Sequence, residues 1–349
     1  MIDYLTVRIT LPRPLPHAID GGHFTRTGEA GEVEQSTARR KRVIGSHEAT
    51  LHIRAQSTAE LELTGNPAKF VQGHNLYGSS DPVEVLWAAL LLMEGAGALP
   101  CSLASLGLSG PLTMASCTEI SRIDCTVMLL GLTWFDVETS LRSLRVAGRL
   151  RDRGASGLPH PWDRGGGVTF GSAPGKSMRH RSITFYSKGE DVKVHPLPAL
   201  MANDSEVMEW VKRSLRCEVR LGSNYLRKTG LRAMENWTAE TALDEWKAMM
   251  ERVDMNGSDE RPEGLEKLPA HLQVAYAAWL SGADLSTMFA RRTYYRKRAE
   301  ILKAIDVDIA IPKPTEPTAQ IVPIKRVIEL EPASRPSWAD RIDAELAAA

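Results

Sequence analysis

The sequence predicts an α+β protein in which helices cover one face of a central, mainly antiparallel sheet, with a small helical domain near the C-terminus. Five segments alternate apolar and polar residues with period two, which is typical of half-buried strands. Helical patterns lie between them, and a glycine-, proline- and acid-rich run at 254–270 precedes further helical patterns. Because the second face of such a sheet stays polar, it offers a platform for a partner.

The strand segments each direct apolar residues toward a core and polar residues outward. They are residues 4–11, 60–64, 120–127, 181–188 and 215–221. In the first segment, Leu5 and Val7 point inward, whereas Tyr4 and Thr6 point outward. The outward face collects one acid from each of three strands, together with a tyrosine and a lysine two residues apart: Glu62, Asp124, Glu218, Tyr186 and Lys188.

Capping residues predict where helices begin. Asp81 is suited to cap a helix over the apolar run 85–93, because Pro82 fits the first helical position and Glu84 completes a capping box. Two more helices are predicted in the first domain: 136–147, capped by Asp136, and 205–214.

Four regions are predicted along the chain. The first domain spans residues 1–253, and a linker follows at 254–270. Residues 271–310 outline a helix-turn-helix segment that would bind DNA. Closely spaced prolines break all periodicity at 311–349, which is expected to be a mostly disordered tail with one helix near 338–346.

The composition of the 349-residue chain is that of a globular protein, with 43% hydrophobic and 25% charged residues. The longest apolar run, 85–93, is too short to span a membrane, and the first eleven residues lack a signal-peptide pattern. We therefore expect a cytoplasmic protein without a membrane partner. The four cysteines form no CxxC pair and no zinc-ligand spacing with histidine, which argues against a disulfide framework or a zinc site.

Basic residues are clustered although the net charge is zero, with 43 basic and 43 acidic residues. Residues 142–181 carry nine basic side chains against two acidic ones, residues 291–303 carry six against one, and a third cluster lies at 39–42. Such segments suit DNA, because phosphate contacts release counterions and interleaved aromatic rings stack on bases. One cluster alone is more often a solvated face, but three together favour a nucleic-acid partner.

The outward face also suggests chemistry. Glu62, Asp124 and Glu218 could bind a divalent cation if their strands are neighbours, because Mg²⁺ and Mn²⁺ prefer oxygen ligands. The hydroxyl of Tyr186 could attack phosphorus and stay covalently attached, with Lys188 among the cations that stabilise the phenolate. Taken singly, such residues are more often ion-pair partners or packing residues, so the hypothesis depends on their convergence on one face.

Four blocks of residues carry a family resemblance. They are NPAK at 66–69 with QGHN at 72–75 and Gly78; ISRID at 120–124; RHR at 179–181 with Tyr186 and Lys188; and Arg216, Glu218 and Arg220 with Tyr225-Leu226 and Gly230-Leu231. In these blocks, the chain resembles the filamentous-phage replication initiators, the gene II product family.

The resemblance implies a rolling-circle initiator with a Rep-like nicking domain, which cuts one strand of phage origin DNA at a specific site. Tyr186 matches the family's nucleophile, which forms a 5′-phosphotyrosine link and later rejoins the displaced strand. The implied partners are single- and double-stranded origin DNA and the host replication helicase and polymerase, the latter extending the free 3′-hydroxyl. The implied location is the cytoplasm of the bacterial host.

Related nicking initiators hold a metal with a His-hydrophobic-His pair, which this chain lacks. The expected ligands of Mg²⁺ or Mn²⁺ are therefore the three outward carboxylates together with His74. The expected catalytic residues are Tyr186, Lys188 as a phosphate partner, and His180 as a phosphate contact or proton-transfer group. DNA contacts are expected at Arg122, Arg179, Arg181, Arg216, Arg220, Arg292, Tyr295, Arg296, Lys297 and Arg298.

Other functions are compatible with the same residues. A non-enzymatic DNA-binding regulator would be built around residues 271–304, although this segment could equally be a packing unit with an aromatic core at Tyr276 and Trp279. A tyrosine recombinase is the weaker alternative, since those enzymes are mainly helical. The glycines at 165–167 match a P-loop too poorly to predict ATP hydrolysis.

Overall fold

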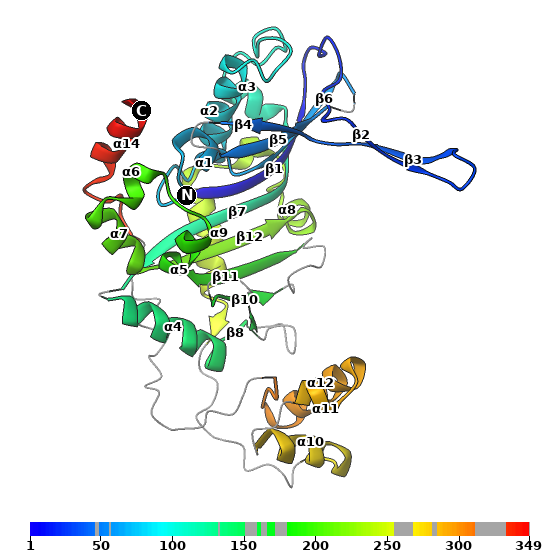
Figure 1. Ribbon diagram of the computed structural model, residues 1–349, viewed down its shortest axis with the longest axis vertical. Coiled ribbons are helices and arrows are strands. Elements are labelled where there is room, and N and C mark those ends of the chain that lie inside the picture. The colour runs from blue at the N-terminus through cyan, green and yellow to red at the C-terminus, as the bar shows by residue number, and fades with distance from the viewer. Residues whose placement is uncertain are drawn as a thin grey trace.

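The computed structural model describes residues 1–45, 49–55, 57–131, 133–150, 159–161, 166–171, 180–254, 268–280, 285–310 and 333–348. The architecture is α+β, as predicted: a large antiparallel sheet carries helices, and a helical segment follows it in the chain (Figure 1). None of the described helices combines the length and the apolar character that crossing a membrane requires.

The strands of the large sheet, within the described residues and in spatial order, are β4 (Lys41–Ile44), β5 (Thr50–Arg54), β6 (Glu60–Gly65), β1 (Ile2–Thr10), β7 (Thr118–Leu130), β12 (Ser214–Gly222), β11 (Arg181–Ser187), β10 (Val168–Gly171) and β9 (His160–Pro161). Each neighbouring pair is antiparallel. All five predicted strands are confirmed, as β1, β6, β7, β11 and β12.

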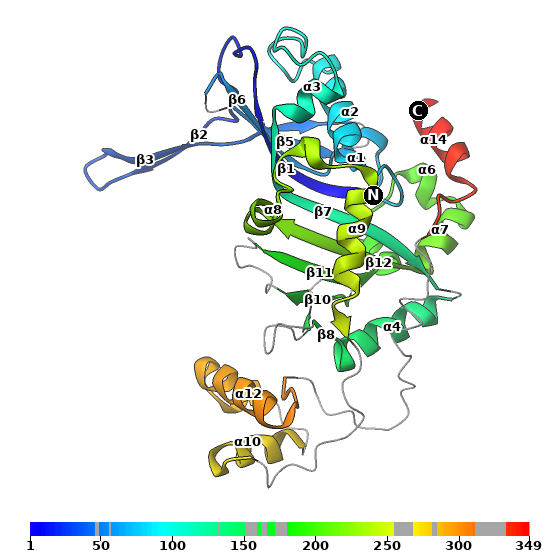
Figure 2. The same ribbon diagram turned by 180° about the vertical axis from the view of Figure 1, so that it is seen from behind.

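Two smaller strand pairs accompany the sheet. β8 (Arg149–Leu150) pairs with β13 (Val253–Asp254), and β2 (His23–Thr27) pairs with β3 (Val33–Ala38). The β2–β3 ribbon extends away from the body of the molecule (Figures 1 and 2). Its apolar residues Phe24 and Val33 are exposed. Because neither side of the ribbon is buried, its sequence lacks the apolar–polar alternation that predicts a strand.

The helices of the described residues are α1 (Pro67–Gln72), α2 (Pro82–Gly95), α3 (Pro111–Ser116), α4 (Trp134–Ala147), α5 (Lys188–Val194), α6 (Ala199–Ala202), α7 (Ser205–Lys212), α8 (Ser223–Thr229), α9 (Ala239–Met250), α10 (Ala270–Leu280), α11 (Leu285–Met288), α12 (Arg291–Ile305) and α14 (Ala339–Ala348), with a 3₁₀ turn at Met234–Asn236.

Local signals explain two helix starts. The Asp81 carboxylate accepts hydrogen bonds from the backbone of Val83 and Glu84 at the start of α2, as predicted, although Glu84 itself bonds to the Ser79 hydroxyl. In α4 the cap is Thr133 rather than the predicted Asp136, which instead accepts a hydrogen bond from the Thr133 amide as the third residue of a capping box.

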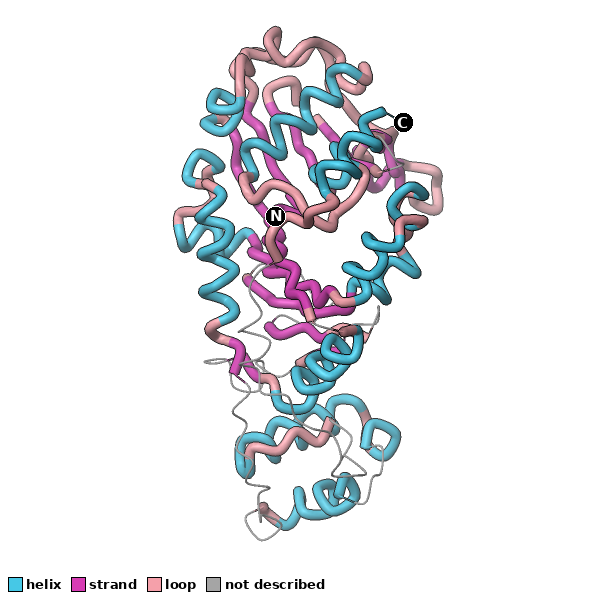
Figure 3. Tube along the Cα trace, turned by 90° about the vertical axis from the view of Figure 1, so that its left-hand side faces the viewer, coloured by secondary structure: helices cyan, strands magenta, loops and turns pink. Residues whose placement is uncertain are grey.

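The apolar face of the sheet carries the main core. Leu86 of α2, Leu144 of α4 and Met249 of α9 belong to the same buried cluster as inward sheet residues such as Val219. α9 crosses this face in Figure 2, and helices flank the sheet on both sides in Figure 3. The polar face is therefore not open along its whole length: residues of α6 and α7 pack at one end, around Met128 of β7.

The described residues after the first domain form two parts. α10, α11 and α12 form their own small core, which includes Leu272, Tyr276 and Ile301 and confirms the predicted helical segment. The helix predicted near residues 338–346 is α14, which packs on the first domain through Trp338. The predicted linker, except residues 254 and 268–270, and residues 311–332 of the predicted tail lie outside the described residues.

Candidate active site

Tyr186 lies on the polar face of β11, the face that its alternation predicts. Its hydroxyl donates a hydrogen bond to Glu218 of the neighbouring strand β12, with 2.6 Å between the oxygens. The expectation that this polar face is an open platform for a partner does not hold at Tyr186, because the residue is only 5% exposed. Burial raises the pKa of the phenol well above its usual value, so Tyr186 is neutral in this state.

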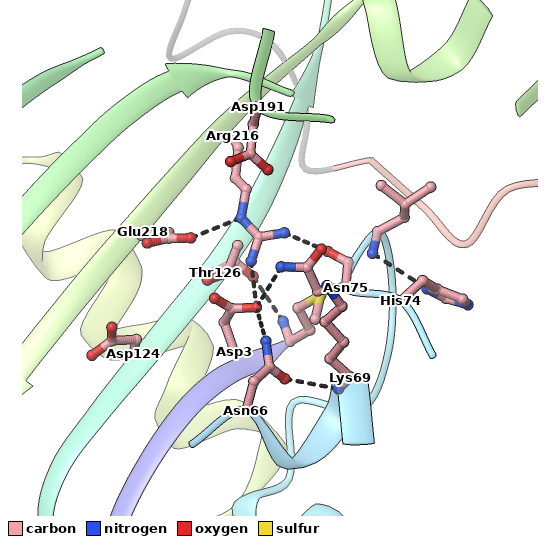
Figure 4. Close-up of polar contacts among 12 residues, drawn as sticks. Asp3, Asn66, Lys69, His74, Asn75, Asp124, Thr126, Asp191, Arg216 and Glu218 are labelled. Carbon is pink, nitrogen blue, oxygen red and sulfur yellow. Dashed lines mark hydrogen bonds and ion pairs between the residues drawn. The ribbon is translucent and has the colours of Figure 1, made fainter. Parts of the chain in front are cut away.

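Arg216 is the centre of a buried polar cluster (Figure 4). Its guanidinium lies 6.0 Å from the centre of the Tyr186 ring. Its Nε lies 2.8 Å from the Glu218 carboxylate, and its Nη2 lies 2.6 Å from Asp3 of β1. The remaining Nη1 donates to the backbone oxygen of Asn75. The arginine is completely buried; burial lowers its pKa, but Asp3, Tyr186 and Glu218 outweigh this and keep it charged.

The two carboxyl groups around Arg216 respond differently to the site. Burial raises the pKa of Glu218, an effect that Arg216 only partly offsets. Burial acts on Asp3 in the same direction, but the guanidinium of Arg216 and a hydrogen bond from Asn75 hold the pKa of Asp3 below its usual value. Glu218 is therefore the group of this pair more disposed to accept a proton.

The loop after α1 completes the cluster. The Asn75 side-chain amide donates to Asp3 at 3.0 Å, and its oxygen accepts from the Lys188 ammonium at 3.0 Å. Lys188 also pairs with Asp191 at 2.6 Å and is buried, and burial lowers its pKa. Lys188 is the first residue of α5 rather than the last residue of the strand, because the Ser187 hydroxyl caps that helix.

Sequence reasoning missed four residues of this cluster: Asp3, Asn66, Asn75 and Asp191. Asn66 caps α1 and donates to Asp3 at 2.7 Å. Asn66 and Asn75 lie in the NPAK and QGHN blocks, which were the available signal for both. Asp3 had no such signal, because its role depends on the pairing of β1 with β7.

Asp124 occupies a second polar position on the same face. In register across the sheet, Tyr4 of β1 pairs with Asp124, which pairs with Arg220 of β12. The carboxylate is buried and accepts hydrogen bonds from Arg122 at 2.6 and 2.9 Å and from Arg220 at 3.2 Å. Both arginine side chains are 29% exposed, so this pair presents positive charge at the surface.

Glu62 lies elsewhere on the sheet. Glu62 pairs in register with Arg8 of β1, whereas Asp124 pairs with Tyr4 of the same strand, four residues away. Its carboxylate pairs with Arg54 at 2.5 Å, Arg8 at 3.4 Å and Arg40 at 3.8 Å. The expectation that the acids of β6, β7 and β12 converge therefore does not hold for Glu62.

The residues expected to bind a metal do not fit one another in this structure. Each of the three carboxylates is held by arginine, and the imidazole of His74 is completely buried, 3.7 Å from Asp343 of α14. Among the described residues, no three His, Cys, Asp or Glu side chains form a group that could hold a metal ion. Binding of Mg²⁺ or Mn²⁺ stays a prediction.

The RHR block is spread over different positions. His180 is exposed, and alternation would place it on the same face as Tyr186. The two residues are six positions apart, however, which is about 20 Å at the rise of a strand. Arg181 lies on the opposite, apolar face, where its guanidinium contacts Tyr225 of α8. Arg179 lies outside the described residues, so its predicted DNA contact has no structural description.

The basic residues of α12 also separate into two groups. Arg292, Arg296 and Tyr295 are exposed and accessible to a partner. Arg298 is mostly buried and forms two 2.6 Å contacts with the Asp308 carboxylate, so it holds the helical segment together. Lys297 donates to the backbone oxygen of His271 at 2.6 Å, which links α12 to α10.

Comparisons with known proteins agree with the resemblance carried by the four sequence blocks. For the phage "Replication-associated protein" family of the gene II type, the N-terminal family model matches residues 1–240 and the C-terminal model matches residues 262–341. The replication-associated protein of Enterobacteria phage I2-2 is 30% identical over 356 residues, covering 98% of this chain and 97% of that protein. No solved structure matches the chain. The predicted resemblance is confirmed, and the chain belongs to the gene II-type replication-associated protein family.

Proposed function

We propose that the protein initiates phage rolling-circle replication by nicking one strand of the origin at a specific site, with Tyr186 as nucleophile. Membership of the replication-associated protein family supports the replication role. The observation that carries the nicking proposal is the 2.6 Å contact between the Tyr186 hydroxyl and Glu218, beside the Arg216 guanidinium. A nucleophile, a proton acceptor and a fixed positive charge thus adjoin on one sheet face.

The proposed reaction exchanges one phosphodiester bond for another. The phenol oxygen attacks the scissile phosphorus while its proton passes to the Glu218 carboxylate, and Arg216 stabilises the developing negative charge. The P–O3′ bond breaks, and the departing 3′ oxygen takes the proton held by Glu218 to become a 3′-hydroxyl, which leaves Glu218 as a carboxylate again. The 5′-phosphate stays on Tyr186. Attack by the 3′-hydroxyl of the displaced strand on this phosphotyrosine rejoins the strand and returns the proton to the phenol.

DNA must uncover the site before this reaction begins, because Tyr186 is buried in the free protein. We propose that Arg122 and Arg220, which are partly exposed on the same face, contact the strand to be cut. Arg292, Tyr295 and Arg296 of α12 would contact flanking origin duplex. Arg181 and Arg298 already serve contacts within the protein, so we assign them no DNA contact.

The proposal also places the protein in its surroundings. Its 3′-hydroxyl product is the end that a host polymerase extends, and strand displacement requires a helicase, so the host replication helicase and polymerase are the proposed partners. The proposed location is the bacterial cytoplasm, where the origin DNA is replicated.

The test is covalent capture of DNA by the purified full chain. A supercoiled plasmid carrying the cognate origin, incubated with Mg²⁺, should become nicked and leave a protein–DNA adduct that survives denaturing electrophoresis. Tyr186→Phe should form no adduct, because the ring stays but the nucleophile is lost. Tyr225→Phe is the matched control, since Tyr225 contacts Arg181 on the opposite face and should not change adduct yield. An adduct with Tyr186→Phe at the wild-type yield contradicts the assignment.

A further inference from the structure

The C-terminal segment 333–348 returns to the first domain and packs beside the candidate site. The Ala333 amide donates to the backbone oxygen of Met128 in β7 at 2.8 Å. Trp338 is buried, with its ring centroid 5.6 Å from that of Tyr77 and 5.9 Å from that of Trp210. Ile342 is completely buried in the same cluster. The segment is therefore seated by apolar burial rather than loosely attached.

Polar contacts join this segment to the loop that follows α1. The Tyr77 hydroxyl donates to the Asp343 carboxylate at 2.6 Å and lies 3.3 Å from the backbone oxygen of Ala339. Arg335 pairs with Asp343 at 2.5 Å and places its guanidinium 4.9 Å from the centre of the Tyr77 ring. One carboxylate of α14 thus engages both the loop and the chain that leads into α14.

The same loop reaches the buried cluster on its other side. Two residues before Tyr77, Asn75 contacts the Lys188 ammonium at 3.0 Å, Asp3 at 3.0 Å and the Arg216 guanidinium. His74, next to Asn75, is completely buried, and its Nε2 atom has no hydrogen-bond partner among the described residues, with Asp343 at 3.7 Å. The loop is thus held between α14 and the groups around Tyr186.

We propose that residues 333–348 are a positioning element of the candidate active site, in which Asp343 and Trp338 hold loop residues 74–77 so that Asn75 stays on Lys188 and Arg216. Neither residue touches the reacting atoms; both act through the loop. The two family matches, which cover residues 1–240 and 262–341, then describe parts of one working unit rather than two independent domains. The expected effect on catalysis rests on the proposed nicking function, but the claim that residues 333–348 hold the loop does not.

Amide hydrogen exchange of the full chain tests the structural statement. In Asp343→Ala and in Trp338→Ala, backbone amides of residues 74–78 should exchange at least about tenfold faster than in the wild type, because the loop loses its outer support and opens locally. Glu345→Ala is the matched control, because Glu345 is an acid of the same helix whose carboxylate lies 3.8 Å from Arg341 and, within the described contacts, not against the loop. The amide of Val219, in the core of β12, reports whether each variant is still folded.

Unchanged exchange at residues 74–78 in both variants, with Val219 protected, overturns the proposal. Equal acceleration in Glu345→Ala also overturns it, because the effect would then be unspecific.

Nicking is measured in parallel: the two variants should form adduct at least about tenfold more slowly while binding origin DNA as tightly as the wild type. Faster loop exchange with a wild-type adduct rate overturns the positioning role. If the wild type forms no adduct at all, the nicking function fails, while the exchange result still decides whether 333–348 holds the loop.

Discussion

At the scale of single residues, Arg216 determines the electrostatics of the candidate site. A buried carboxylate is costly unless it is paired, and this one guanidinium serves both Asp3 and Glu218. It also lies within 6.0 Å of the Tyr186 ring centre. The same contacts that stabilise the fold therefore place a positive charge where the proposed phenolate would develop, so stability and chemistry cannot be separated by removing this residue.

Replacement of Arg216 is expected to be severely destabilising. Arg216→Met keeps the length of the side chain but leaves the buried Glu218 and the mostly buried Asp3 without their cation, which should lower the free energy of unfolding by about 3–5 kcal/mol. Arg232→Met is the matched control, because Arg232 pairs with Glu119 at 2.5 Å where both side chains are nearly half-exposed. Its expected cost is about 0–1 kcal/mol. Urea denaturation of both variants measures the difference, and similar losses would contradict the structural role of Arg216.

His74 should make stability depend on pH. Burial lowers its pKa from 6.5 to about 4, despite the opposing influence of Asp343. Between these values the unfolded chain binds a proton that the folded chain does not, so His74 reduces stability as pH falls from 6.5 toward 4, and this loss levels off below 4. The contribution amounts to about 3 kcal/mol at the usual 1.36 kcal/mol per pKa unit.

Urea denaturation at several pH values checks this expectation. In His74→Gln, which cannot take up the proton, unfolding free energy should change less between pH 6.5 and pH 4 than in the wild type. An unaltered pH dependence in His74→Gln would show that another group causes it.

At the scale of elements, alternation located five strands of the large sheet, and capping and apolar patterns located several of the helices. In β1, β6, β7, β11 and β12, apolar residues alternate with polar ones because only one side of each strand faces the core. The sequence alone therefore predicts which residues of these strands point inward. β11 also shows the limit of that signal. Period-two alternation continues to Lys188, but the Ser187 hydroxyl accepts the Glu190 amide and starts α5, which turns Lys188 into the buried cluster.

The candidate site could be predicted only in part, for a related physical reason. Alternation shows which face a residue occupies, but not the order of strands, their register or what covers the face. Tyr186 and Glu218 lie on adjacent strands, so their common face was sufficient to group them, whereas Arg216 was expected only to contact DNA. Glu62 shares the polar character but pairs in register with Arg8, which separates it from Asp124. The burial of Tyr186 arises from contacts distant in sequence, which no local pattern contains.

At the scale of the whole molecule, the chain closes on itself around the candidate site. Residues from β1 near the N-terminus, the loop after α1, strands β11 and β12, and α14 near the C-terminus all contribute to it or to its support. The helical segment 268–310 has its own core and does not contribute to this cluster within the described contacts. The exposed basic residues of this segment can therefore bind DNA without taking part in the candidate active site.

That division predicts how DNA affinity depends on salt. If Arg292 and Arg296 each contact a phosphate, the double variant Arg292→Ala/Arg296→Ala should reduce the slope of log affinity against log salt by about 2, because each lost contact releases about one counterion fewer. Lys193→Ala is the control, since Lys193 is exposed on α5 but already pairs with Glu190 at 2.7 Å, and its slope should match the wild type. Arg298 is unsuitable for this test because its loss leaves Asp308 buried without a partner.

Fluorescence anisotropy with origin duplex over a KCl series measures the slopes. A double variant with the wild-type slope would mean that α12 does not bind the DNA backbone, and that affinity comes from the sheet arginines instead.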